Sequence, residues 1–266
     1  MVSVITIYPI VYGIYLSFAE FSGSVGLENY NYVFSTYSVT DAILNTLLIV
    51  GAALTIQFLL ALLTALLLNR DFRGRGFFRT VIMVPFGVAT VVSGIAFTFI
   101  FSPSGWYLNS LLIHLGLIST GIDWIRPIPV AIMSVALADS WKNFPLIMLI
   151  LLGGLSSIPQ SQYESAAIDG AGFVKQFIYI TLPGLFPFIM IAVTIRLIQE
   201  VNILSLPLVL TGYTPAFLGT LSFQIYETFS VGSANQAAAV ATILLGIVVL
   251  LVTIYIIISR RLGMEG

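Results

Sequence analysis

The sequence predicts an all-α integral membrane protein with six transmembrane helices, and three observations predict it. Only 8% of the 266 residues are charged, 59% are hydrophobic, and the mean hydropathy is +1.07. A soluble domain has about 25% charged residues, so a chain this poor in charge must have lipid as its main solvent. Apolar runs of spanning length recur along the chain, and its basic residues gather in alternate loops.

Six apolar segments reach or approach the roughly 20 residues that a helix needs to cross a bilayer. They are residues 1–19, 44–68, 80–101, 130–152, 184–205 and 237–259. The first is short and contains Pro9, which a spanning helix tolerates when neighbours satisfy the freed carbonyl. The fifth is less regular at its far end, where Pro207 interrupts the run. We expect residues 1–266 to form one transmembrane domain.

The basic residues predict the orientation. Seven of the ten fall in loops on one side of the predicted bundle: Arg70, Arg73, Arg75, Arg79, Lys175, Arg260 and Arg261. The loops on the other side hold only Arg126. The positive-inside rule makes the basic side cytoplasmic. A multi-pass protein of the plasma (inner) membrane with both termini in the cytoplasm is therefore expected.

Several classes of chemistry are excluded. The sequence has no cysteine, which excludes disulfides and thiolate metal sites. Its single histidine, His114, has no companion ligand at metal spacing. No phosphate-binding GxxxxGK[ST] loop is present, so any ATP that drives this protein is hydrolysed by another chain. We expect a non-enzymatic subunit with no cofactor of its own and no nucleic-acid partner.

Residues 159–183, "PQSQYESAAIDGAGFVKQFIYITLP", interrupt the apolar pattern. Pro159 suits the first turn of a helix, and Gly170 and Gly172 permit a turn. The predicted structure is a helix–turn–helix under the membrane, whose second helix would be amphipathic. A face with little bulk, made of Tyr163, Ala166, Ala167 and Gly170, would be left for a partner. The alternative is an interfacial hairpin that has no partner.

This stretch resembles the EAA loop of binding-protein-dependent ABC importer permeases. The family pattern is EAA, three residues, Gly, nine residues, Ile, one residue and Leu-Pro. The sequence has Glu164-Ser165-Ala166, Gly170, Ile180 and Leu182-Pro183 at that spacing, with Ser165 as the one departure. Asp169-Gly170-Ala171 matches the DGA of carbohydrate importers. The resemblance assigns ATPase coupling to Glu164, Ser165, Ala166, Asp169, Gly170 and Ala171.

Further landmarks extend the resemblance along most of the chain. "YPIVYGIYLSF", "GLENYNYVF", "RGRGFFRTVIMVPF" and "LTGYTP" are similar to stretches of sugar-importer permeases, although the last departs from the usual LTGGGP. The resemblance implies a type I ABC importer permease fold and alternating access. It also implies a second, homologous permease subunit, two ATPase subunits that bind ATP and Mg, and an extracytoplasmic substrate-binding protein as partners.

Three charged residues lie near the middle of predicted spans: Lys142, Arg196 and Glu200. A central charge costs roughly 2.5–3.5 kcal/mol on insertion scales, so each is a functional candidate. Arg196 and Glu200 are spaced i, i+4 and can pair on one helix face. They could be a structural pair, a gate, or part of a polar cavity for a hydroxyl-rich ligand. Asp139 and Trp141 flank the same turn as Lys142.

The resemblance favours the cavity. It places the sugar-contacting positions of the larger maltose permease on Lys142, Asn143, Leu146, Arg196, Gln199, Glu200 and Ile203. The predicted function is therefore ATP-driven import of a carbohydrate. Three alternatives stay open. The first is an ABC permease for a phosphorylated polyol or another polar solute, such as an amino acid or phosphate. The others are an ion-coupled secondary transporter with a relay at Arg196 and Glu200, and a scaffold protein.

Overall fold

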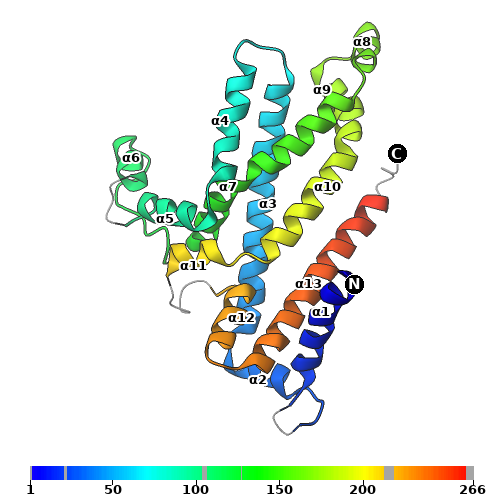
Figure 1. The fold of residues 1–266 in the computed structure, drawn as a ribbon. Coiled ribbons are helices and arrows are strands. Elements are labelled where there is room, and N and C mark those ends of the chain that lie inside the picture. The colour runs from blue at the N-terminus through cyan, green and yellow to red at the C-terminus, as the bar shows by residue number, and fades with distance from the viewer. Residues whose placement is uncertain (1, 21–22, 104–106, 127, 213–218, 262–266) are drawn as a thin grey trace.

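The computed structural model describes residues 2–20, 23–103, 107–126, 128–212 and 219–261, and these residues are almost entirely helical (Figure 1). The end of the "LTGYTP" landmark, residues 213–215, lies outside them. The helices are α1 (Val2–Phe18), α2 (Glu28–Thr36), α3 (Val39–Asn69), α4 (Arg75–Gly87), α5 (Thr90–Ile100), α6 (Leu108–His114), α7 (Ile128–Ser157), α8 (Gln160–Ile168), α9 (Phe173–Gln176), the π-helical turn η1 (Phe177–Thr181), α10 (Leu182–Val201), α11 (Ser205–Thr211), α12 (Leu221–Ser230) and α13 (Ala234–Arg261).

Four helical stretches are long and apolar enough to cross a membrane: Val39–Asn69, Ile128–Ser157, Phe173–Val201 and Ala234–Ser259. The pair α4 and α5 makes a fifth only if it counts as one bent span. The apolar part of α1, Ile7–Phe18, is shorter than a full span. The structure thus confirms an all-α membrane protein with four or five candidate spans, and it does not establish the predicted six.

The predicted span 80–101 is not one unbroken helix. It is divided into α4 and α5, which are bent by 95°. Val88 and Ala89 between them have extended backbone angles, and Pro85 one turn earlier cannot donate a backbone hydrogen bond. Helix α5 then packs against α11. Gly94 allows that approach, because a Cβ atom there would lie 2.9 Å from Cγ1 of Val209.

The predicted fifth span, 184–205, also has different limits. Helix α10 ends at Val201, and Pro207 lies inside the separate helix α11. At its start, α10 is continuous with α9 through η1. Pro183 explains the π-helical turn, because it has no N–H and its ring crowds the carbonyl four residues earlier. The turn widens, and the Leu182 N–H bonds to the carbonyl of Phe177, five residues back.

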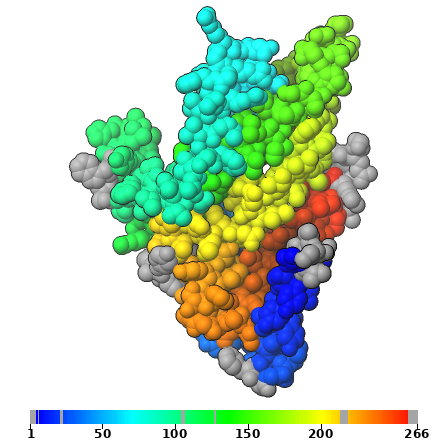
Figure 2. Space-filling view, viewed as in Figure 1, coloured from blue at the N-terminus to red at the C-terminus, as the bar shows by residue number. Residues whose placement is uncertain are grey.

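The core is centred on α3 and α7, which pack along each other (Figure 1). Small side chains on α3, including Ala53, Ala61 and Ala65, are fully buried and let the two helices approach. Helix α10 packs against both. The α3–α4 turn and the α8–α9 hairpin project at the same end of the molecule, whereas α2 and α12 lie at the opposite end (Figures 1 and 2).

Candidate functional site

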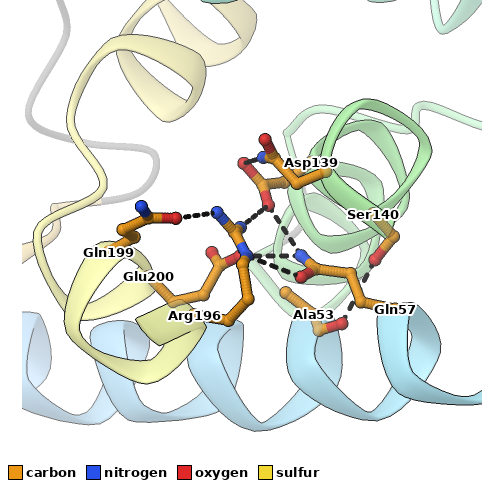
Figure 3. A network of polar contacts seen from close by, with 8 residues as sticks. Ala53, Gln57, Asp139, Ser140, Arg196, Gln199 and Glu200 are labelled. Carbon is orange, nitrogen blue, oxygen red and sulfur yellow. Dashed lines mark hydrogen bonds and ion pairs between the residues drawn. The ribbon is translucent and has the colours of Figure 1, made fainter. Parts of the chain in front are cut away.

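A buried polar cluster joins α3, α7 and the last turns of α10, and Arg196 of α10 is its centre (Figure 3). Its Nε donates to Oε1 of Gln57 at 3.0 Å, and its Nη1 donates to Oε1 of Gln199 at 2.6 Å. Its Nη2 donates to Oδ2 of Asp139 at 3.1 Å and to Oε1 of Glu200. The predicted i, i+4 ion pair between Arg196 and Glu200 is therefore present, but it is one contact of several.

Gln57 links the two carboxylates from the α3 side. It is fully buried, and its Nε2 donates to Oδ2 of Asp139 at 2.8 Å and to Oε1 of Glu200 at 2.7 Å. Asn143, one turn along α7, donates to the other oxygen of Asp139 at 2.9 Å. Each of the three helices thus contributes to one hydrogen-bond network, which fixes their register at this depth.

The cluster sets one guanidinium against two carboxylates, and all three groups are almost completely buried. Three oxygens of these carboxylates have partners, whereas the buried Oε2 of Glu200 has none among the described residues. A buried acceptor without a partner is destabilising by about 1–3 kcal/mol, and by more when it is charged. A group that donates a hydrogen bond to this oxygen would therefore remove that cost and gain binding free energy.

A pocket of about 260 Å³ opens beside this cluster. Its lining residues come from α7, α10, the start of α5 and the loop into α11, and nine of the eleven are polar: Thr90, Asp139, Lys142, Asn143, Arg196, Gln199, Glu200, Asn202, Ile203, Leu204 and Ser205. The Nζ of Lys142 lies 5.8 Å from the centroid of the Phe86 ring. No carboxylate of the described residues pairs with Lys142. We call this space the central pocket.

The second candidate site is the α8–α9 hairpin, where the predicted helix–turn–helix is confirmed. Helix α8 ends at Ile168, and Gly170 follows with φ = 76°. The N–H of Gly170 bonds to the carbonyl of Ala167, and that of Ala171 to the carbonyl of Ala166. This is a Schellman ending, which needs a left-handed residue at the position that Gly170 occupies.

The prediction of which hairpin face is left free was wrong in part. The hydroxyl of Tyr163 lies 3.0 Å from that of Thr181, so Tyr163 binds the second arm of the hairpin instead of facing outward. Ala166 is likewise half-buried. The exposed side carries Glu164, Ser165 and Ile168, the last with 87% of its surface accessible. Tyr163 is therefore an internal brace.

The hairpin also contacts the end of α3. The guanidinium carbon of Arg70 lies 5.8 Å from the centroid of the Phe173 ring. A cavity of about 650 Å³ lies between the last turns of α3, including Leu67, and hairpin residues such as Gln160 and Gln176. Arg70 was noted in the sequence only for its charge, and its cation–π contact orients the hairpin against the α3–α4 end.

Residues 57–263 match the family described as "Binding-protein-dependent transport system inner membrane component". The matched region includes both the central pocket and the hairpin. The chain belongs to this family. It is a permease subunit.

Curated relatives agree with the family. The permease is 30% identical over 237 residues to the trehalose/maltose transport system permease protein of Thermococcus litoralis, covering 89% of this chain and 80% of that one. It is 29% identical over 269 residues to the sulfoquinovosyl glycerol transport system permease protein of Agrobacterium fabrum, covering 98% and 87%.

A solved structure supports the fold. The permease superposes with a TM-score of 0.83 and 23% identity on a chain of a bacterial alginate ABC transporter in complex with an alginate pentasaccharide-bound periplasmic protein. The match covers 98% of the permease and 90% of that chain. At this identity the likeness shows the fold alone, and that fold is the one of an ABC importer permease.

Most predicted pathway residues of the permease meet at one place. Six of the seven line the central pocket: Lys142, Asn143, Arg196, Gln199, Glu200 and Ile203. Leu146 does not line it, because it lies one helical turn further along α7. Trp141 also points elsewhere, with its ring edge-on to Phe97 at 5.5 Å.

Sequence reasoning missed Gln57 and gave Asp139 no role. Both are polar residues inside apolar helices, and that signal would have sufficed to select them. What the sequence could not supply was their distance from Arg196, since the three residues lie on three different helices.

Proposed function

We propose that this permease subunit imports a carbohydrate in an ATP-driven, binding-protein-dependent transporter. The observation that carries the proposal is the polar central pocket, which is lined by Lys142 of α7 and by Glu200 of α10 with its buried, unpaired oxygen. Hydroxyl groups both donate and accept hydrogen bonds, so a sugar can satisfy both. Relatives named for trehalose, maltose and sulfoquinovosyl glycerol support this substrate class.

The proposed partners follow from the family and from the exposed hairpin. A second permease subunit would complete the passage, and two ATPase subunits would bind ATP and Mg. Glu164, Ser165, Ala166, Asp169, Gly170 and Ala171 would form the coupling segment, through which ATPase closure biases the helices between inward- and outward-facing arrangements. The periplasmic protein bound to the alginate transporter supports a binding protein as the fourth partner.

The hairpin end would face the cytoplasm. Arg70, Arg73, Arg75 and Arg79 border the α3–α4 turn at that end, and the positive-inside rule favours the cytoplasm for such loops. In this orientation both chain termini are cytoplasmic, and the α2 and α12 end receives the binding protein. The protein would reside in the inner membrane.

Uptake by the reconstituted complex tests the proposal. Proteoliposomes holding both permeases and the ATPase, with the binding protein outside, are offered a panel of radiolabelled sugars, glycerol phosphate and amino acids with or without internal ATP. ATP-dependent uptake of at least one sugar is expected. ATP-dependent uptake of glycerol phosphate or amino acids alone overturns the carbohydrate assignment, and uptake that continues without ATP indicates an ion-coupled transporter.

A further inference from the structure

We infer that the central pocket selects an uncharged, hydroxyl-rich substrate and rejects acidic sugars and phosphorylated polyols. This inference rests on the proposed function and narrows it. The family does not decide the matter, because trehalose and maltose are uncharged whereas sulfoquinovosyl glycerol carries a sulfonate. The presence of Arg196 and Lys142 would by itself suggest an anionic substrate. The pairing of Arg196 with two carboxylates, and the acids that share the pocket with Lys142, point to the opposite conclusion.

The formal charges that line the pocket cancel. Lys142 and Arg196 are formally positive, Asp139 and Glu200 are formally negative, and the other lining residues are uncharged. The pocket therefore has no net formal charge to offer an anion. In a site surrounded by apolar helices, where the effective dielectric is low, an uncompensated charge on a substrate would be strongly disfavoured.

Arg196 has little capacity left to bind an anion. Four of its five N–H groups already donate within the protein, two of them to the carboxylates of Asp139 and Glu200. A substrate carboxylate or phosphate that takes two N–H groups would have to displace one of the present acceptors, and a displaced carboxylate would remain buried nearby without compensation. The guanidinium therefore acts as the internal counterion of two protein acids.

Two unpaired groups border the pocket, and they differ in kind. Oε2 of Glu200 is buried at its edge and, as a carboxylate oxygen, accepts hydrogen bonds, whereas Nζ of Lys142 can only donate. No ion pair joins them in the described structure, so they are separate contact points in one pocket. A hydroxyl-rich molecule satisfies both. A carboxylate satisfies Lys142 alone, leaves Glu200 unpaired and adds a like charge to its surroundings.

Direct binding to the purified permease–ATPase complex, without the binding protein, measures the selectivity of the pocket itself. Equilibrium dialysis at millimolar ligand compares trehalose with trehalose 6-phosphate, and glucose and galactose with glucuronate and galacturonate. We expect each neutral sugar that binds to do so at least about tenfold more tightly than its acidic counterpart. Equal or tighter binding of the acidic members overturns the inference, as does the absence of binding by every sugar.

The variant Glu200→Gln sharpens the test, because it removes one negative charge and leaves the pocket with a net positive charge. The ratio of neutral to acidic affinity should fall by about tenfold. The matched control is Glu227→Gln, the same chemical change at a half-buried carboxylate on α12 that does not line this pocket; its ratio should match that of the unmodified complex. An unchanged ratio in Glu200→Gln overturns the inference.

Assembly is checked by co-purification with the ATPase. Should Glu200→Gln fail to assemble, Asp139→Asn provides the same change of charge on α7, with the same expected fall in the ratio. The two proposals fail differently in the uptake assay. If no sugar is taken up, the proposed carbohydrate function is wrong. If acidic sugars are taken up as fast as neutral ones, only the inferred charge selectivity is wrong.

Discussion

At the residue scale, the cluster around Arg196 shows how a membrane protein holds three charged groups away from water. Each formal charge there has an opposite charge within hydrogen-bond distance. The amide of Gln57 donates to the same two carboxylate oxygens, one of Asp139 and one of Glu200, that accept from Arg196. Arg196 suits this position because its planar group makes several directed bonds at once and stays charged. A lysine in its place would reach fewer of these acceptors.

Gln57→Leu is expected to destabilise the assembled complex. The substitution removes one acceptor for Arg196 and the amide donor shared by Asp139 and Glu200, and each unsatisfied buried group costs about 1–3 kcal/mol. The midpoint of thermal inactivation of the detergent-solubilised complex should fall. Thr55→Val, at an exposed position of α3, is the control and should leave the midpoint unchanged. Equal midpoints for both variants would contradict the role given to Gln57.

At the element scale, the sequence predicted most helices and failed where tertiary contacts decide. The apolar runs predicted α3, α7 and α13, because such runs must be helical in lipid. The sequence gives only a weak local signal for the break between α4 and α5. The packing that follows the break involves the contact of Gly94 with Val209, which is 115 residues away along the chain. The hairpin turn was predictable, since Gly170 is the residue that a left-handed ending requires.

Gly94→Ala tests the close approach of α5 to α11. The added methyl group would lie 2.9 Å from Cγ1 of Val209, and overpacking of this kind typically costs about 1–3 kcal/mol. The thermal midpoint of the complex should fall, and protease should gain access to the α5–α11 region. Gly87→Ala is the matched control, because a Cβ there meets no atom of the described structure within 4 Å. A Gly94→Ala complex as stable as the Gly87→Ala complex would refute the close-approach explanation.

Gly170→Val tests the hairpin turn in a similar way. Here the substitution is unfavourable because it strains the backbone, and not because the side chain collides with a neighbour. A Cβ at Gly170 would have open space around it, but φ = 76° costs a residue with a side chain about 1–2 kcal/mol. We expect normal membrane insertion with loss of ATPase association or of coupled transport. Gly172→Ala, at an ordinary φ of −73°, should retain both. Coupled transport at the normal rate in Gly170→Val would contradict the proposed role of the turn.

At the scale of the whole molecule, two helices join the two candidate sites. Helix α10 carries Arg196 and Glu200 at one end and is continuous through η1 with the hairpin at the other. Helix α7 carries Asp139 and ends at Ser157, with two residues between it and the start of α8. Both arms of the hairpin therefore lead to the same buried cluster, and a movement of the hairpin would act on the charges that line the central pocket.

The separation of the two sites predicts opposite effects of two single substitutions. Glu164→Ala removes an exposed carboxylate of the hairpin and leaves the central pocket intact, so ATPase association or stimulation should weaken while sugar binding by the assembled complex stays the same. Glu200→Ala removes the unpaired acceptor of the pocket, so sugar affinity should fall by about tenfold or more with little change in basal ATPase activity.

Equilibrium dialysis and ATPase assays on the same preparations check both parameters. Because α10 is continuous with the hairpin and only two residues separate α7 from it, the substrate-dependent stimulation of ATP hydrolysis should be lost in both variants, although for different reasons. Glu164→Ala loses it because the hairpin no longer transmits the signal, and Glu200→Ala because the pocket no longer generates it. A variant that loses sugar binding but keeps full substrate-dependent stimulation would show that the central pocket is not the site that the ATPase senses.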